Sequence, residues 1–496
     1  MAQELEFKLA IDPQAAAGFW PALRERLPGI RPARRALYSA YYDTPDGHLQ
    51  RHGIALRLRR QGGQWLQTVK RGGEAAGGLH RRLEHEAPVA ARLPSFPAME
   101  DAGIGEVVAP VREALGVVFT TDFERTSALV RPGAGTVIEV ALDRGAILAD
   151  GRREPICEVE LELKAGEPQA LFDLARWIAQ TLPVRLDDRS KAERGYRLAA
   201  GWRPAPAKAG DSALEPGLST GEAMRRLGFQ CLVHLQANEA GLLAGRNPEY
   251  LHQARVALRR LRSLLRMLRT PVPDPALSSL LERLRALARQ LGAARNLDVF
   301  LGETLPRAGS ASYPGMAKLR QRAVLARRAA SREARAAASA PAYTGLMLDV
   351  LDYLARLDAA TGPPVEAMAA DLLGRLHRRA RKRGRRVGTL GVAELHRLRI
   401  ALKRLRYAME FFKPLWPRAM PDALAALSDL QDALGGFNDA ATAWKLLDAL
   451  AVESHEAAYQ QAVGYVRGWT AREAQRRRRE LPAAWKRFIR LKPGWR

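Results

Sequence analysis

The chain has 496 residues, of which 47% are hydrophobic and 27% charged, and its formal net charge is +26. This composition excludes a disordered chain, and no run of about 18 apolar residues predicts a membrane span. The excess of cations favours a polyanionic partner. Only two cysteines are present, Cys157 and Cys231, and the N-terminus lacks the apolar segment of a secretory signal. We therefore expect a cytoplasmic protein without disulfides.

The positive charge is concentrated in the second part of the chain. Residues 1–200 hold 28 Lys and Arg against 27 Asp and Glu, whereas residues 201–496 hold 51 against 26. Between them, residues 201–217 are rich in proline and small residues, which is typical of a linker. We therefore predict a domain over residues 1–200, a linker over 201–217 and a second domain over 218–496.

The first domain is predicted to be α+β, with short strands interrupted by amphipathic helices. Glu4-Leu-Glu-Phe-Lys8 alternates charged and apolar residues, and so do residues 56–59 and 158–164. Successive side chains of a strand point to opposite faces, so the charges of each strand share one face. One such strand is ordinary in any sheet with a solvated face. Because charges of both signs recur and the opposite faces are apolar, we predict a closed barrel with charge inside and helices outside.

A lumen lined by cations and carboxylates together suits a polyphosphorylated ligand bound with a metal. Clustered carboxylates would repel a phosphate unless a divalent cation lay between them, and Mg²⁺ or Mn²⁺ prefers oxygen ligands of both kinds. Lys and Arg would bind the remaining phosphate oxygens.

The N-terminal segment ELEFK resembles the E-x-E-x-K signature of the CYTH superfamily, also called triphosphate tunnel metalloenzymes. The resemblance covers residues 1 to about 200 and continues through eight further segments in the same order. These segments are Tyr41-Tyr-Asp-Thr-Pro45, Gly53-Ile-Ala-Leu-Arg-Leu-Arg59, Thr68-Val-Lys70, Arg82-Leu-Glu-His-Glu86, Arg125, Asp143, Glu158-Val-Glu-Leu-Glu162 and Ser190-Lys-Ala-Glu-Arg-Gly-Tyr196.

The resemblance implies an eight-stranded antiparallel tunnel and metal-dependent hydrolysis of inorganic triphosphate to pyrophosphate and phosphate. It implies phosphate binding and catalysis by six cations: Lys8, Arg57, Arg59, Lys70, Arg125 and Lys191. Glu4 and Glu6 join the catalytic set, because they would orient the attacking water through the metal. The metal ligands implied are Glu4, Glu6, Asp143, Glu158, Glu160 and Glu162, with Glu84 and Glu86 as further candidates.

The second domain is predicted to be all α-helical and contains an internal repeat. The segment His252-Gln-Ala-Arg-Val-Ala-Leu-Arg-Arg-Leu-Arg262 aligns with His396-Arg-Leu-Arg-Ile-Ala-Leu-Lys-Arg-Leu-Arg406. A second similarity follows each copy, at residues 291–296 and 434–439. We therefore predict two related helical bundles.

Each copy places basic residues along one stripe of a helix, beside a stripe of leucines. A stripe of this kind is usually a solvated face, but adjacent like charges repel, and its presence in both copies favours a bound anion. Residues 476–479 are four further arginines near the C-terminus, which we expect to be solvated charge. The candidate anion-binding residues are His252, Arg255, Arg259, Arg262, His396, Arg399, Lys403 and Arg406.

These copies resemble the CHAD domain, a histidine-containing helical module that often accompanies CYTH domains. The resemblance implies two pseudo-symmetric helical bundles that bind inorganic polyphosphate, and it would allow association with polyphosphate granules. A CYTH domain followed by a CHAD domain resembles the two-domain inorganic triphosphatases of bacteria.

Two other classes of function stay open at this point. The tunnel motifs also fit a thiamine or nucleoside triphosphatase and a class IV adenylate cyclase. The chain could instead be a non-enzymatic protein that binds polyphosphate or nucleic acid. Aromatic residues are only 6% of the chain and no base-reading motif is evident, so we expect no specific nucleic-acid partner and no membrane partner.

Overall fold

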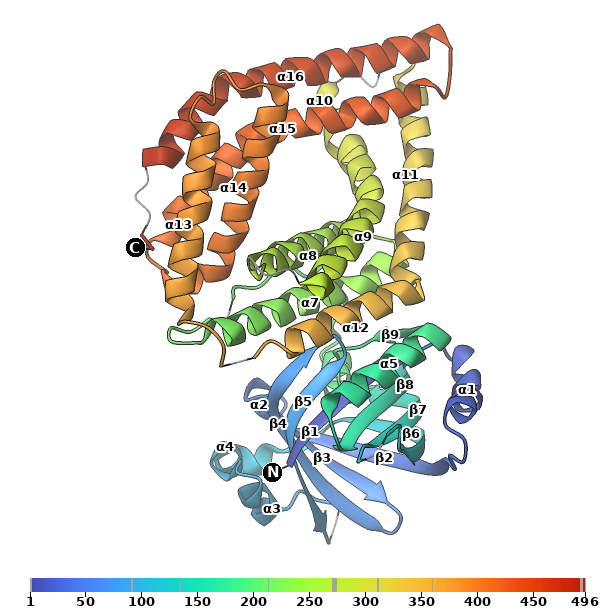
Figure 1. The fold of residues 1–496 in the computed structure, drawn as a ribbon. Helices are drawn as coiled ribbons and strands as arrows, with labels where there is room; N and C mark the ends of the chain where they lie inside the picture. Colours follow the sequence, from blue (N-terminus) through green and yellow to red (C-terminus); the bar gives the residue numbers. More distant parts are fainter. Residues whose placement is uncertain are drawn as a thin grey trace. The chain divides into compact units, whose positions relative to one another are not determined.

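The structure is a computed structural model that describes residues 2–90, 92–133, 135–212, 214–269, 274–309, 312–358, 360–490 and 494–495. The chain divides into two compact units (Figure 1). The first comprises Met1–Ala205 together with Ala340–Asp352, and the second comprises Pro206–Ser339 and Tyr353–Arg496. The first division falls inside the proline-rich segment 201–217, whereas residues 340–352 group with the first unit.

The first unit is built on an antiparallel barrel. Along the sheet the strands follow the order β5-β4-β3-β2-β6-β7-β8-β1, and β1 pairs with β5, which closes eight strands into a ring. The predicted eight-stranded tunnel is therefore confirmed. A short ninth strand, β9, adds to the end of β1. The strands are β1 (Ala2–Ile11), β2 (Ala33–Asp43), β3 (Ile54–Gln61), β4 (Gln64–Ala76), β5 (Leu79–Val89), β6 (Gly116–Val130), β7 (Val137–Ala149), β8 (Arg152–Ala165) and β9 (Val184–Leu186).

Because charged and apolar residues alternate along a strand such as β1, its charged side chains lie inside the barrel and its apolar side chains lie outside it. In β1, Phe7 and Leu9 are fully buried on the outer face, and the ring of Phe7 packs edge-on against Phe172, 5.0 Å away. Phe172 belongs to α5 (Pro168–Thr181), which covers this part of the wall. The other helices of the unit are α1 (Phe19–Arg26), α2 (His48–Arg51), α3 (Phe96–Asp101), α4 (Gly105–Val108), α6 (Lys191–Ala199) and most of α12 (Pro341–Ala355).

The second unit is helical, and the sequence repeat corresponds to a repeat of structure. Helix α7 packs on α8 and α9 on α11, and in the second copy α13 packs on α14 and α15 on α16 (Figure 1). The leucine stripes of α8 and α14 are buried, which explains why the basic stripes beside them face elsewhere. The helices are α7 (Thr220–Ala244), α8 (Pro248–Met267), α9 (Pro275–Val299), α10 (Leu305–Ala308), α11 (Met316–Ser339), α13 (Val365–Gly384), α14 (Val392–Phe412), α15 (Met420–Ala451) and α16 (Ala457–Arg490). Within the described residues, no helix has a stretch long and apolar enough to cross a membrane.

Candidate functional site

A cavity of about 500 Å³, here called the tunnel, is lined by inward-facing side chains of the barrel strands. Nine basic and seven acidic side chains line it, so it is nearly balanced in charge. Asp143 and Glu158 do not line it but are fully buried in its wall. The predicted residues that line the tunnel are Glu4, Glu6, Lys8, Arg57, Arg59, Lys70, Glu84, Glu86, Arg125, Glu160, Glu162 and Lys191.

Four arginines of the tunnel come from strands whose described residues contribute no carboxylate to its lining, whereas Lys8, Arg82 and Lys164 lie on the strands that carry the carboxylates. Arg35, Arg57, Arg59 and Arg125 come from β2, β3 and β6, which are adjacent strands. The carboxylates come from the contiguous set β7, β8, β1 and β5. The pairing of strands explains each group, because residues directly opposite on neighbouring strands share a face. A bound anion with an attached cation would match this division.

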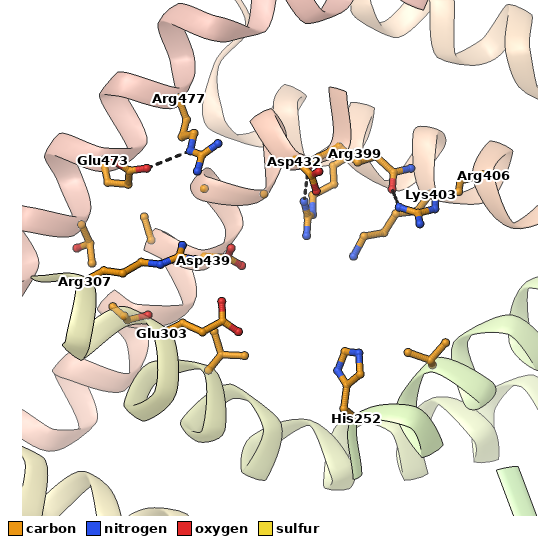
Figure 2. A pocket seen from close by; sticks show the side chains of 18 of the residues that line it. His252, Glu303, Arg307, Arg399, Lys403, Arg406, Asp432, Asp439, Glu473 and Arg477 are labelled. Atoms are coloured by element: carbon orange, nitrogen blue, oxygen red, sulfur yellow. Dashed lines mark hydrogen bonds and ion pairs between the residues drawn. The ribbon is translucent and has the colours of Figure 1, made fainter. Parts of the chain in front are cut away.

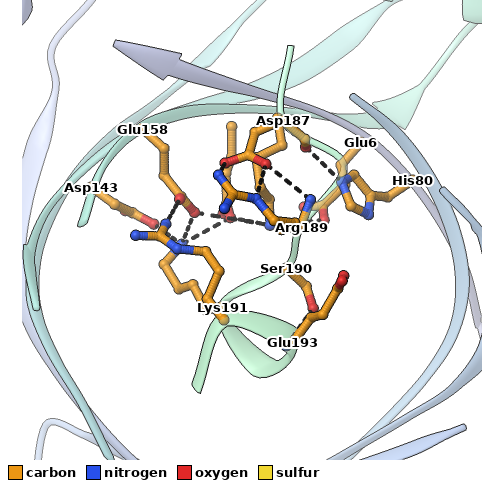
Figure 3. A network of polar contacts seen from close by, with 12 residues as sticks. Glu6, His80, Asp143, Glu158, Asp187, Arg189, Ser190, Lys191 and Glu193 are labelled. Carbon is orange, nitrogen blue, oxygen red and sulfur yellow. Dashed lines mark hydrogen bonds and ion pairs between the residues drawn. The ribbon is translucent and has the colours of Figure 1, made fainter. Parts of the chain in front are cut away.

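Two lysines, Lys8 and Lys191, are held by the buried carboxylates, and Figure 3 shows Lys191 beside Asp143 and Glu158. The ammonium of Lys191 donates to Asp143 and Glu158, each at 2.6 Å, and to Glu160 at 2.9 Å. Lys8 Nζ lies 3.0 Å from Glu160 Oε1. Burial alone would lower the pKa of both lysines, but these carboxylates raise it above the ordinary value. Both lysines therefore remain charged and fixed in position.

The position of Lys191 is set by the start of helix α6. Ser190 is the N-cap, and its hydroxyl oxygen accepts a hydrogen bond from the backbone N–H of Glu193 at 3.1 Å. A cap of this kind satisfies one of the free amides at the beginning of a helix. The helix therefore begins at Lys191 and presents this side chain to the tunnel.

The arginines of the tunnel differ in how well they are neutralised. Arg125 donates two hydrogen bonds to Asp143, at 2.8 and 2.7 Å, and a third to Glu160. Arg59 instead donates to the Ser39 hydroxyl at 3.2 Å. Burial, together with the neighbouring charges of Arg57 and Arg125, lowers the pKa of Arg59 to about 9. An anionic ligand next to Arg59 would offset the repulsion from Arg57 and Arg125.

Arg57 also lacks a full set of partners. Its Nη2 lies 3.4 Å from Glu84 Oε1, and its Nε is buried without a hydrogen-bond partner among the described residues. Arg57 and Arg59 are thus the tunnel cations with spare capacity to bind phosphate oxygens.

The donor set of the tunnel offers oxygen ligands to a divalent metal, although basic side chains already bond to several of the carboxylates, as Lys70 does to Glu4 at 2.7 Å and Lys164 does to Glu162 at 2.6 Å. Asp143, Glu158 and Glu160 offer oxygens within 4.8 Å of one another, but Lys191 already bonds to all three. Glu4 faces the lumen, where burial and the nearby charge of Glu6 raise its pKa. Burial likewise raises the pKa of Glu162. Carboxylates held together in this way favour a hard cation between them.

Sequence reasoning did not assign twelve of the lining residues to the site, and five of these twelve carry a charged or phenolic side chain: Arg35, Tyr41, Arg82, Glu139 and Lys164. The alternation of strand residues could have found several of them. Arg35 pairs with Arg125 across β2 and β6, and Glu139 pairs with Glu162 across β7 and β8. Each therefore faces the same side as a residue that the motifs did identify.

The second unit contains a cavity of about 660 Å³, here called the helical cavity (Figure 2). Five of the eight candidate anion-binding residues line it: His252, Arg259, Arg399, Lys403 and Arg406. Arg255 and Arg262 lie half-buried on α8 outside the lining, and His396 is exposed. The two repeat histidines therefore do not form a matched pair in the cavity.

The expectation that residues 476–479 are only solvated charge is wrong for Arg477. This side chain lines the helical cavity and lies 3.0 Å from Glu473 (Figure 2). The cavity also holds five carboxylates, contributed by segments outside the two predicted stripes. Some neutralise a cation directly, as Glu410 does for Arg406 at 2.7 Å.

Other cations of the helical unit have no carboxylate partner among the described residues. Burial, with the charges of Arg399 and Arg259, lowers the pKa of Lys403 to about 7. Burial and Arg259 lower the pKa of Arg255 to about 10. Buried nitrogens of Arg255, Arg259 and Arg262 have no hydrogen-bond partner among the described residues. Buried polar groups are rarely left unpaired, so Arg259, which of these three arginines is the one that lines the cavity, is suited to bind an anion.

Comparison with known proteins agrees with both halves of this description. The CYTH domain family matches residues 2–196 and the CHAD domain family matches residues 227–448. An inorganic triphosphatase of Haemophilus influenzae is 34% identical over 198 residues, which are 40% of this chain and 55% of that protein. The chain thus spans about half the length of that relative. The crystal structure of the CHAD domain from the plant Ricinus communis is 34% identical, with a TM-score of 0.52, and the match covers 58% of this chain and 98% of that one. Residues 2–196 therefore belong to the CYTH domain family and residues 227–448 to the CHAD domain family.

Proposed function

We propose that the tunnel hydrolyses inorganic triphosphate to pyrophosphate and phosphate with the help of Mg²⁺ or Mn²⁺. The observation that carries this proposal is that β2, β3 and β6 line the tunnel with four arginines and no carboxylate, whereas all the lining carboxylates of the described residues come from β7, β8, β1 and β5. The similarity to an inorganic triphosphatase over 198 residues supports it. A metal bound by the lumen-facing carboxylates would neutralise phosphate oxygens and activate the attacking water.

The residues of the chain would act mainly by positioning and neutralising the substrate. Arg59 binds phosphate oxygens because no carboxylate among the described residues is bonded to it, and Arg57 does so because its Nε has no hydrogen-bond partner among them. Lys8, Lys191 and Arg125 are held by carboxylates and supply fixed positive charge. The water oxygen forms a bond to the terminal phosphorus, the bridging P–O bond breaks with its electron pair leaving on pyrophosphate, and a proton of the water is released to the solvent. Fixed cations lower the barrier because charge moves onto these oxygens in the transition state.

The tunnel lining favours an inorganic substrate over a nucleotide or a thiamine ester. Among the described lining residues, Tyr41 is the only aromatic one. Its ring stacks on Phe119, with centroids 4.4 Å apart and an interplanar angle of 17°, so that face is already occupied. A nucleobase or thiazolium ring would find no free aromatic platform there.

We further propose that the helical cavity binds inorganic polyphosphate without hydrolysing it. This assignment is supported by the unpaired buried Nε of Arg259 and by the lowered pKa of Lys403, two residues that line the cavity. A polyanion would supply the missing counter-charge to both. The candidate residues His252, Arg259, Arg399, Lys403 and Arg406 would contact it, and Arg477 extends the same surface.

The test is the initial rate of phosphate release from tripolyphosphate, ATP, thiamine triphosphate and long-chain polyphosphate. Each substrate is measured with Mg²⁺, with Mn²⁺ and with excess EDTA. We expect tripolyphosphate to have the highest kcat/KM and EDTA to abolish its turnover. A higher kcat/KM for ATP or thiamine triphosphate would contradict the substrate assignment. Undiminished turnover in EDTA would contradict the role of the metal.

A further inference from the structure

Helix α12 belongs to one domain by sequence and to the other by packing. It lies inside the segment 227–448 that matches the CHAD family, yet residues 340–352 are part of the compact unit of the barrel. Its apolar side chains are at most 4% exposed at Leu346, Met347, Leu348, Val350 and Leu351. A helix that is buried on all sides is part of a core. The barrel unit therefore contains a piece that the later sequence supplies.

Polar contacts fix α12 to two elements of the barrel unit. Arg176 on α5 donates a hydrogen bond to Asp349 at 2.8 Å and another to Asp352. The Thr344 hydroxyl donates to the backbone carbonyl of Val184, in β9, at 3.0 Å. Thr344 is 4% exposed and Asp352 is 5% exposed. The contacts of Arg176 are charge-assisted and part-buried, and the contact of Thr344 is buried, so together they set the geometry of α12.

Strand β9 is followed directly by a segment that bonds to the backbone of Lys8 and that carries Lys191. Val184 precedes Lys191 by seven residues, and the N–H of Asp187 donates to the carbonyl of Lys8 at 3.0 Å. On the other side, the N–H of Lys8 donates to the carbonyl of Gly78 at 2.8 Å. The backbone of Lys8 is therefore hydrogen-bonded on one side to the segment after β9 and on the other side to the turn between β4 and β5.

Helix α12 also contacts the turn between β4 and β5. Gly77 has a φ of +65°, and a Cβ placed on it would lie 2.7 Å from Leu351 Cδ2. Gly78 in turn donates its N–H to the carboxylate of Asp188 at 2.5 Å. One helix thus touches both segments that hold the backbone of Lys8, and one of them carries Lys191.

We propose that α12 is a positioning element for the two buried lysines of the tunnel. Thr344 anchors β9, and Asp349 and Asp352 anchor α5, so that the ammonium groups of Lys8 and Lys191 stay within reach of Glu160. The effect on catalysis rests on the proposed triphosphatase activity, whereas the effect on geometry does not. A barrel cut after Ala205 would lack this element, although it would contain every tunnel-lining residue.

The test uses the full chain with Thr344→Val, which keeps the shape of the side chain and removes the donor. We expect kcat/KM for tripolyphosphate to fall about tenfold, and Thr344→Ser to restore it. Amide hydrogen exchange of residues 184–191 should become at least tenfold faster, with exchange in α14 unchanged. Asp349→Asn, which weakens the contact to Arg176, should give a smaller change in the same direction. The matched control is Asp371→Asn, which removes an exposed ion pair on α13 and should change neither readout.

Hydrogen exchange separates this inference from the proposed function. If the wild-type chain hydrolyses no triphosphate, the proposed function fails, and faster exchange confined to residues 184–191 still supports the anchor. Three results would overturn the inference: exchange within twofold of wild type in Thr344→Val, acceleration throughout the barrel, or failure of Thr344→Ser to restore the wild-type values.

Discussion

The two cavities differ in how their buried cations are neutralised. In the tunnel, Lys8, Lys191 and Arg125 each bond to carboxylates, and their pKa values are raised despite burial. In the helical cavity, Lys403 and Arg399 have no such partner among the described residues, and their pKa values are lowered. Buried basic side chains are therefore neutralised by carboxylates in the tunnel, whereas in the helical cavity some of them lack a carboxylate partner among the described residues.

Under the proposed functions, this difference separates a site that is preorganised for catalysis from one that is completed by its ligand. Groups fixed before the substrate arrives need no reorganisation during the reaction, which is how enzymes stabilise a transition state. Unpaired buried cations instead store repulsion that a bound polyanion relieves, and this relief contributes to affinity. Arg59 is the exception in the tunnel, because it lacks a carboxylate partner among the described residues.

The largest expected effect is that of Lys8→Ala. We expect kcat/KM for tripolyphosphate to fall at least ~100-fold, which corresponds to about 2.7 kcal/mol of lost transition-state stabilisation. The melting temperature should fall too, because Glu160 and Glu6 lose a buried partner. Steady-state kinetics and calorimetry measure the two effects. Activity within threefold of wild type would mean that Lys8 does not act on the substrate.

Arg59→Met sharpens the comparison, because this cation lacks a neutralising partner among the described residues. We expect kcat/KM to fall ~50-fold, since the substrate loses a phosphate ligand. The free energy of unfolding should stay equal or rise, because the variant removes a buried charge whose pKa is lowered. Urea unfolding of Arg59→Met beside Lys8→Ala measures this. A loss of stability as large as that of Lys8→Ala would contradict the distinction between the two cations.

In the helical cavity, reversing two charges tests whether the anion site is local. Arg259→Glu with Lys403→Glu should weaken binding of long-chain polyphosphate ~30-fold at ~150 mM salt, about 2 kcal/mol. The matched control is Arg472→Glu with Arg479→Glu, which makes the same change of net charge at exposed positions outside the cavity lining. Binding should then change less than threefold. Equal losses in both variants would show that only bulk charge is involved.

The smallest expected effect is a pH dependence of polyphosphate binding. With a pKa of about 7 in the empty cavity, Lys403 is charged at pH 6 and mostly neutral at pH 8. A bound polyanion favours the charged form, so binding takes up a proton, and affinity should fall about tenfold between pH 6 and pH 8, or ~1.4 kcal/mol. Lys403→Arg should bind with little pH dependence over this range. Equal slopes for the two proteins, measured by calorimetry, would contradict the assignment.

The barrel and most of its lining could be predicted because strand geometry maps directly onto sequence. A period of two determines which residues share a face, so the alternation by itself predicts that Glu4, Glu6 and Lys8 lie together. The helical residues were harder to place. His252 and His396 occupy equivalent positions in the repeat, but His252 lines a cavity and His396 is exposed, because other segments decide what covers each helix.

Two features depend on packing between elements that are distant in sequence, and no local pattern indicates them. Arg477 faces the helical cavity because of how α16 lies against α15, although its run of four arginines is typical of a solvated segment. Helix α12 groups with the barrel although residues on both sides of it belong to the helical unit. Its apolar sequence predicts burial, but not which core it enters.

The central claim is that catalysis and polyphosphate binding reside in separate cavities with different electrostatics. The most direct measurement tests each variant for the function that we propose for the other cavity. Lys8→Ala is assayed for polyphosphate binding, and Arg259→Glu with Lys403→Glu is assayed for turnover of tripolyphosphate. We predict that the first keeps its dissociation constant, and the second its kcat/KM, within threefold of wild type. A loss of more than tenfold in either crossed assay, with the variant correctly folded, would contradict the account.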